Sequence, residues 1–445
     1  MGQRTRTLTE ILGYRGWKVR EAFFEYADGR RADIVPWAGL TVAVRLVLRM
    51  ERRCAAGCSH CDGRCRTVHE RLKARRWTDL PWGGRSVEIE AELVRVECAR
   101  CHGNRVERVP WASPYQRQTR RLQQHVAVLA ASMPVLHVAA THGLSWSTVR
   151  RAEGAALARW DATRPRTPLR QAGVDEKWLG RRHHRDDDYV TIVSNLELGE
   201  PLWIGFGRDE ETLAAWIATQ SAEEKAGIQL FAMDMHRAFF NAVRADPALD
   251  HAAIVHDPFH VMKRVNEAVD EVRREVFFRA GPELRRVGRG TRWLFLRAWE
   301  RSGESEQMEI EYLCSCNRLL ARTYQIKEEL RGVLRADTRD AMETGLRRIL
   351  RRTQARANVP LRKLHDSLRA HWVPILALGE HRPPVGRVEA LNNNWETLVR
   401  RARGYRDLQY LLLKLKFMTA NPIRDESGVT RFLSLGLPPP MRRAA

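Results

Sequence analysis

The chain has 445 residues and carries 76 lysines and arginines against 54 aspartates and glutamates, a formal net charge of +22. This length allows roughly two to four domains, and the basic excess favours a polyanion, nucleic acid above all, over a membrane surface. No stretch approaches about eighteen apolar residues, and the N-terminus lacks the apolar core of a signal peptide, which argues against spanning or exported classes. We therefore expect a soluble, intracellular protein.

The cysteines cluster near the N-terminus. Two CxxC pairs supply the four residues Cys58, Cys61, Cys98 and Cys101. Paired knuckles of this kind offer four thiolates to a tetrahedral Zn²⁺. The alternating residues 85–96 predict one strand running into the second pair, as in a zinc ribbon, so residues 1–115 are expected to form an N-terminal β-hairpin and zinc ribbon. The alternatives left open are other ligands nearby, Cys54, Cys65, His60 and His102, or reduced thiols without a metal.

The next region, residues 116–168, has the spacing of a helix-turn-helix. Apolar residues recur at helical intervals from Arg121 to Ala158, and a turn containing Gly143 is followed by Ser145 as N-cap. The second helix would present Ser147, Arg150 and Arg151 to a DNA major groove or to flanking phosphates. The alternative is a plain helical hairpin.

Five apolar runs then predict the strands of a mixed sheet. In chain order they cover residues 172–174, 189–196, 202–206, 228–233 and 252–255, with a helix at 212–218. A helical crossover before the fourth strand brings it beside the first, so Asp175 and Asp234 are expected to end neighbouring strands and to face one cleft. This sheet belongs to a catalytic domain predicted at residues 169–430, followed by a tail at 431–445.

A third acid, Glu389, stands on a predicted helix. Leu391, Trp395 and Leu398 recur at helical spacing after a proline-rich break. The polar face that begins at Glu389 is expected to lie over the sheet edge. Since Asp234 and Glu389 are too far apart in sequence for a minimal sheet domain, a large all-helical insertion is predicted at about 262–380.

Three such carboxylates suit phosphodiester chemistry. Mg²⁺ prefers oxygen ligands and is held by few carboxylates plus substrate phosphate, and two such ions activate the attacking oxygen and stabilise the leaving one. Any single acid is more often a solvated surface group. An acid at the end of a buried run differs, because an unpaired buried charge needs a metal or another cation.

Together these motifs resemble the zinc-ribbon DDE transposases of bacterial insertion sequences, in the ISL-three group. The resemblance runs from Cys58 to about Phe417 and rests on the paired CxxC and on the segments 142–149, 174–176, 257–261 and 388–393. It implies that Asp175, Asp234 and Glu389 are the catalytic, metal-binding acids of a ribonuclease H-like fold. The chain departs from the family pattern at residues 394–396, where Asn-Trp-Glu replaces basic residues.

The resemblance also implies a function. We expect a DNA transposase that binds terminal inverted repeats, hydrolyses a phosphodiester with two Mg²⁺ or Mn²⁺ ions, and transfers the strand to target DNA. Synapsis of two ends implies a homodimer or higher homo-oligomer, in a bacterial cytoplasm and associated with the nucleoid. Asp257 is expected to be a capping or supporting residue, and His260 a packed imidazole. The alternatives are a DNA-binding regulator with an inactive or repurposed nuclease domain, or a nuclease without strand transfer.

Overall fold

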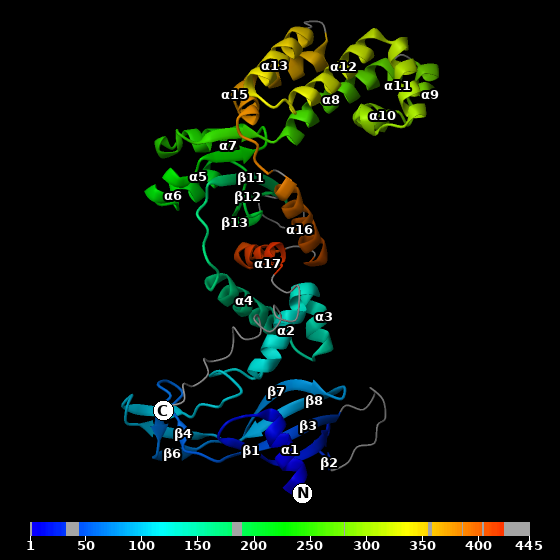
Figure 1. Ribbon diagram of the computed structural model, residues 1–445. Helices are drawn as coiled ribbons and strands as arrows, with labels where there is room; N and C mark the ends of the chain where they lie inside the picture. The colour runs from blue at the N-terminus through cyan, green and yellow to red at the C-terminus, as the bar shows by residue number, and fades with distance from the viewer. Residues whose placement is uncertain are drawn as a thin grey trace. The chain divides into compact units, whose positions relative to one another are not determined.

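The computed structural model describes residues 2–32, 44–179, 189–279, 281–354, 358–384, 386–402 and 405–421. The tail predicted at 431–445 lies outside them. The described chain forms two compact units, one comprising the residues up to Pro165 together with residues 420–421, and the other spanning Arg166–Thr419. Figure 1 shows the elements of both units.

The first unit begins with helix α1 (Gly2–Leu12) and a five-stranded sheet. Its strands, in spatial order, are β2 (Arg31–Ala32), β1 (Trp17–Tyr26), β3 (Val44–Arg52), β8 (Arg85–Ala91) and β7 (Arg75–Trp82). Its core combines aliphatic side chains with a tryptophan cluster, in which the buried Trp111 ring lies 4.9 Å from Trp17 and 5.5 Å from Trp77, centroid to centroid. Edge-to-face contacts of this kind add to the stabilisation from burial.

The first unit also contains two smaller sheets. They contain β10 (Gly103–Val106), β9 (Val94–Cys98) and β6 (Val68–Arg71) in one, and β4 (Ala56–Gly57) with β5 (Arg64–Cys65) in the other. The single strand predicted at 85–96 is therefore wrong: β8 ends at Ala91, and β9 begins at Val94 in a different sheet. Apolar residues alternate within both strands, and only the adjacent Leu93 and Val94 mark the change of phase between them.

Three helices complete the described part of the first unit, α2 (Arg120–Ser132), α3 (Val135–Thr141) and α4 (Trp146–Ala162). Thr119 caps α2, because its hydroxyl accepts the Leu122 N–H at 3.3 Å. The three helices share one apolar cluster that includes Val126, Val138 and Val149. Each helix thus buries one face against the other two.

The second unit contains a mixed sheet. In spatial order its strands are β13 (Glu200–Phe206), β12 (Tyr189–Asn195), β11 (Gln171–Trp178), β14 (Leu230–Met233) and β15 (Ala253–His256). The first three pair antiparallel, and β14 lies parallel to both β11 and β15. The first and fourth strands in sequence, β11 and β14, are adjacent, which confirms the prediction.

Helices cover both faces of this sheet. One face packs on α5 (Glu210–Ala218) and α7 (Arg237–Arg244) through Trp216 and Phe239; α6 (Ala222–Gly227) lies between them in sequence. The other face, including Ala232 and Val255, shares a core with the helices that follow β15. Within the described residues, these helices occupy the chain from Pro258 to Leu376.

Their bounds are α8 (Pro258–Phe278), α9 (Pro282–Gly288), α10 (Arg292–Leu296), α11 (Glu304–Cys316), α12 (Arg318–Val333), α13 (Arg339–Thr353), α14 (Val359–Ala370) and α15 (Trp372–Leu376). Helices α16 (Gly386–Ala402) and α17 (Leu408–Ala420) then complete the described chain. Figure 1 shows α8 leaving the sheet and running into the group of helices α9 to α13.

Candidate functional site

Three aspartates lie at one level of the mixed sheet. Val174 of β11 pairs with Met233 of β14, and Met233 pairs in turn with His256 of β15. Asp175, Asp234 and Asp257 each follow these residues by one position. Since the three strands are parallel, equivalent residues point to the same face of the sheet. The register therefore aligns three carboxylates across adjacent strands.

Glu389 reaches the same cleft from α16. This helix buries Leu391, Trp395 and Leu398, which leaves Glu389 exposed in its first turn. The cleft has a volume of about 660 Å³, and its walls include Asp175, Asp234, Asp257 and Glu389 together with Lys263, Asn392 and Asn393. The three acids predicted from the sequence thus share one cavity.

The carboxylates share this cavity without closing on a single point. Among the described residues, ligand atoms of three or more His, Cys, Asp or Glu side chains approach within 4.8 Å only at a cysteine group. The Lys177 ammonium lies 2.8 Å from Asp175 Oδ2 and partly neutralises it. Lys177 was not predicted as a site residue, although the two-residue alternation of a strand places it on the same face as Asp175.

Burial and like charge both affect these acids. Burial raises the pKa of Asp234; the nearby His260 opposes this, and the carboxylates of Glu176 and Asp175 raise it further. Burial likewise raises the pKa of Asp257, whose neighbours include Asp175 and Glu389. A cleft that buries Asp234 and Asp257 and places further carboxylates beside them favours a bound cation.

Asp257 also has a structural task. It is the N-cap of α8, and its Oδ1 accepts the Phe259 N–H at 2.8 Å. This confirms the expected capping role. His260, in the first turn of the same helix, is half-buried, and its ring lies 5.6 Å from that of Phe259, centroid to centroid.

The helix-turn-helix expected from the sequence is built from α3 and α4. Gly143 adopts φ 61° in the turn, a backbone conformation that favours glycine. Ser145 is the N-cap of α4, and its hydroxyl accepts the Thr148 N–H at 3.2 Å. Both local predictions are confirmed.

The two motifs, acids on a mixed sheet and a helix-turn-helix, are matched by known families. A model of ISL3 DDE transposases, described as "Transposase", matches residues 172–415. A second, described as "Helix-turn-helix domain of transposase family ISL3", matches residues 107–152. The chain belongs to the ISL3 family of transposases. The resemblance drawn from the sequence motifs is therefore confirmed.

Relatives cover nearly the whole transposase. The "Transposase for insertion sequence element IS1001" of Bordetella parapertussis is 30% identical over 415 residues, which are 92% of this chain and 97% of the relative. The "Transposase for insertion sequence element IS1557" of Mycobacterium tuberculosis is 29% identical over 400 residues, 83% of this chain and 87% of the relative. The protein is thus a DDE-type transposase enzyme of insertion sequences, and this chemistry implies divalent metal ions.

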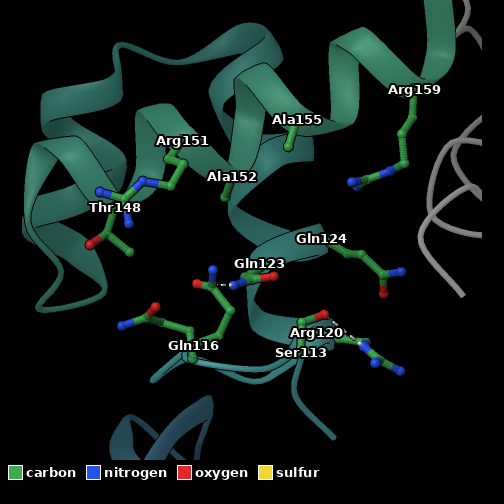
Figure 2. Close-up of a pocket in the computed structure, with 11 residues that line it drawn as sticks. Ser113, Gln116, Arg120, Gln123, Gln124, Thr148, Arg151, Ala152, Ala155 and Arg159 are labelled. Atoms are coloured by element: carbon green, nitrogen blue, oxygen red, sulfur yellow. Dashed lines mark hydrogen bonds between the residues drawn. The ribbon is translucent and has the colours of Figure 1, made fainter. Parts of the chain in front are cut away.

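The DNA-binding unit of the transposase contains a small polar cavity between α2 and α4, of about 130 Å³ (Figure 2). Arg120 at the start of α2 faces it together with Arg151 and Arg159 of α4. No carboxylate stands among the described residues that line it. Burial lowers the pKa of Arg120, and the nearby cation of Arg108 lowers it further. An anion in the cavity would stabilise these guanidinium groups.

Of the three DNA-binding residues predicted from the sequence, only Arg151 lines this cavity. Ser147 bonds with the Ser145 hydroxyl at 3.0 Å, and the Arg150 guanidinium lies 5.8 Å from the centre of the Trp146 ring. Arg120 and Arg159 also line the cavity but were not predicted from the sequence. Helical spacing relates Arg159 to Arg151, two turns away, but Arg120 joins them only through packing between helices.

The cysteine group of the transposase comprises the four predicted ligands, Cys58, Cys61, Cys98 and Cys101, with sulfur atoms all within 4.8 Å. The Cys61 and Cys98 sulfurs are 3.5 Å apart, close to the roughly 3.8 Å expected for a tetrahedral zinc–thiolate site. Cys65 is buried beside this group and its thiol donates to the Gly63 carbonyl at 3.5 Å, whereas Cys54 is exposed. The donor set fits zinc.

No helix in the described stretches of the transposase combines the length and the apolar character needed to span a bilayer.

Proposed function

We propose that Asp175, Asp234 and Glu389 are the catalytic acids of this transposase and that they bind two Mg²⁺ or Mn²⁺ ions. The main support for the proposal is the parallel pairing of Val174 with Met233. The next residues along the chain are Asp175 and Asp234, and both line a cleft that Glu389 also lines. The mixed sheet is then the core of a ribonuclease H-like domain, residues 169–430, and the helices at about 262–380 are an insertion in it.

The donor set suits the proposed ions, because hard divalent cations prefer carboxylate oxygens. When bound, such ions would activate the attacking oxygen and stabilise the leaving one. Asp234 is the key ligand, since burial and two neighbouring carboxylates disfavour its ionised form, and a bound cation would stabilise that form. Lys263 and Arg264 line the same cleft from α8, where they would bind the phosphates on either side of the reacting bond.

The DNA substrate would be held at the ends of the element. Residues 116–168 form the helix-turn-helix region, in which Ser147, Arg150 and Arg151 contact the terminal inverted repeats. Arg120 and Arg159, which face the same cavity as Arg151, would add phosphate contacts without sequence preference. Residues 1–115 form the N-terminal domain, in which a five-stranded sheet stands where a β-hairpin was expected and the cysteine group forms a ribbon with one structural Zn²⁺.

The reaction proposed is hydrolysis at a transposon end followed by strand transfer to target DNA. Pairing two ends requires at least a homodimer. The protein would act in the bacterial cytoplasm, on the nucleoid.

The test uses purified full-length protein, Mg²⁺ or Mn²⁺, and labelled DNA from the boundaries of the open reading frame. Metal-dependent nicking that disappears in Asp234→Asn and persists in Asp250→Asn, an exposed acid of the same unit, supports the proposal. Tight binding without nicking would instead support a DNA-binding regulator. Nicking without joined products would leave a hydrolase that lacks strand transfer.

A further inference from the structure

A second groove adjoins the catalytic cleft. It has a volume of about 970 Å³ and shares Phe259 and Lys263 with the cleft. Its floor is one face of α8, and a wall is formed by α10, which packs against α8. A strand of DNA that enters the catalytic cleft therefore has a continuous path into this groove.

Two large aromatic side chains stand open to solvent in the groove. Phe259 is 69% exposed and Trp293 is 66% exposed, although apolar rings of this size are normally buried. The Arg292 guanidinium lies 5.3 Å from the centre of the Trp293 ring. Exposed rings beside cations are the usual means by which proteins bind the bases of single-stranded nucleic acid.

The charges of the groove also suit an anionic chain. Each of its three carboxylates already has a basic partner: Asp270 pairs with Arg273 at 2.8 Å, Glu267 with Arg264 at 3.4 Å, and Glu271 with Lys363 at 3.5 Å. Lys263, by contrast, makes no ion pair with any residue in the described part of the chain. Its ammonium group therefore remains available to a phosphate.

A buried lysine holds the end of the helix that carries Trp293. The Lys327 side chain is only 1% exposed, and its ammonium donates to the carbonyl oxygens of Phe295 at 2.7 Å and Arg297 at 2.6 Å. These two carbonyls lie at the end of α10, the helix that carries Trp293. Because α10 is held in this way, little ordering would be needed when a base stacks on the ring.

We propose that this groove binds unpaired nucleotides of the DNA strand next to the scissile phosphate, with Phe259 and Trp293 as stacking platforms. Arg292, next to Trp293, lies 3.7 Å from Asp270. Asp270 follows Phe259 by eleven residues of α8, roughly 16 Å along the helix axis. The two rings thus serve different nucleotides, and Lys263, about one turn of α8 after Phe259, binds a phosphate between them. The location relative to the scissile bond rests on the proposed catalytic acids.

The test is binding of a short oligothymidylate that carries one central 2-aminopurine, whose fluorescence falls when the base stacks on an aromatic ring. The full-length protein is used without divalent metal, so that no cleavage occurs. Trp293→Ala and Phe259→Ala should each weaken binding by roughly tenfold and reduce the quenching, whereas Trp293→Phe should retain both. Tyr312→Ala is the matched control, since Tyr312 is 65% exposed on α11 and lies outside the groove.

Equal binding and quenching in wild type, Trp293→Ala and Phe259→Ala would overturn the proposal. Circular dichroism of each variant shows whether it is folded, and because Phe259 and Trp293 stand on different helices, either alanine variant tests the groove if the other does not fold. The outcome is independent of the catalytic assignment, because the probe is not cut: loss of nicking in Asp234→Asn and loss of quenching in Trp293→Ala are separate results.

Discussion

His256 at the end of β15 and His371 between α14 and α15 face each other, with Nε2 of the first 2.9 Å from Nδ1 of the second. They are 115 positions apart in sequence, so this contact joins the end of the helical region to the sheet beside Asp257. Burial lowers the pKa of His256 to about 4 and also lowers that of His371. The pair is therefore stable with both rings neutral, one donating and the other accepting.

This pair predicts acid destabilisation. The pKa of His256 falls from 6.5 in the unfolded chain to about 4 in the fold, so as the pH drops the unfolded chain takes up the proton first. The stabilisation is complete above pH 6.5 and is lost as the pH falls towards 4, by up to about 3 kcal/mol. Urea unfolding across this range should show a smaller loss in His256→Gln than in wild type. The exposed His251→Gln should behave as wild type, and an unchanged slope in His256→Gln would contradict the prediction.

Glu389→Gln should abolish most DNA nicking without preventing folding. The substitution removes one anionic oxygen ligand from the cleft while keeping the side-chain volume, and Glu389 is exposed at the start of α16. We expect the single-turnover nicking rate to fall by about a hundredfold or more. The control is Glu380→Gln, which affects surface contacts with Arg339 at 3.0 Å and His381 at 3.9 Å. A Glu389→Gln rate within a few-fold of wild type would remove this residue from the catalytic set.

Arg151→Ala should weaken DNA binding at every sequence and make it less sensitive to salt. Arg151 lines the cavity between α2 and α4 with two other arginines, which suits a phosphate contact. One lost phosphate contact lowers the slope of log K against log salt by about one. Fluorescence anisotropy over a salt series measures it, with the exposed Arg71→Ala of β6 as control. An unchanged slope would assign Arg151 to a role without a phosphate.

Zinc should bind at about one ion per chain and release protons as it does so. Contact with Cys61 is the main cause that raises the pKa of Cys101, to about 12, whereas backbone donors of Cys101 lower that of Cys98 to about 6. The metal-free group therefore retains protons at neutral pH, and zinc affinity should rise with pH. Cys98→Ser should lower the zinc content, and Cys316→Ser, which changes an exposed thiol, should not. Freshly purified, reduced protein without zinc would refute the site.

Local features were predictable because short-range physics determines them. The order of strands β11 to β15 follows from apolar runs separated by polar breaks, and the N-cap at Ser145 follows from one hydroxyl before a helical stretch. The boundary between β8 and β9 was not predicted, since apolar residues alternate on both sides of it and only the adjacent Leu93 and Val94 mark a change of phase. Arg120 was not predicted either, because only the packing of α2 on α4 brings it to the same cavity as Arg159.

The sequence by itself determined the family, the separate zinc, helix-turn-helix and carboxylate motifs, and the residues that carry them, because each depends on chemistry within a few positions of the chain. Only the tertiary structure decided which side chains meet: Asp257 in line with Asp175 and Asp234, three arginines around one cavity, and Phe259 and Trp293 open along one groove. These associations depend on strand register and on which helix faces pack together. Burial of the whole core selects both, and no local pattern encodes them.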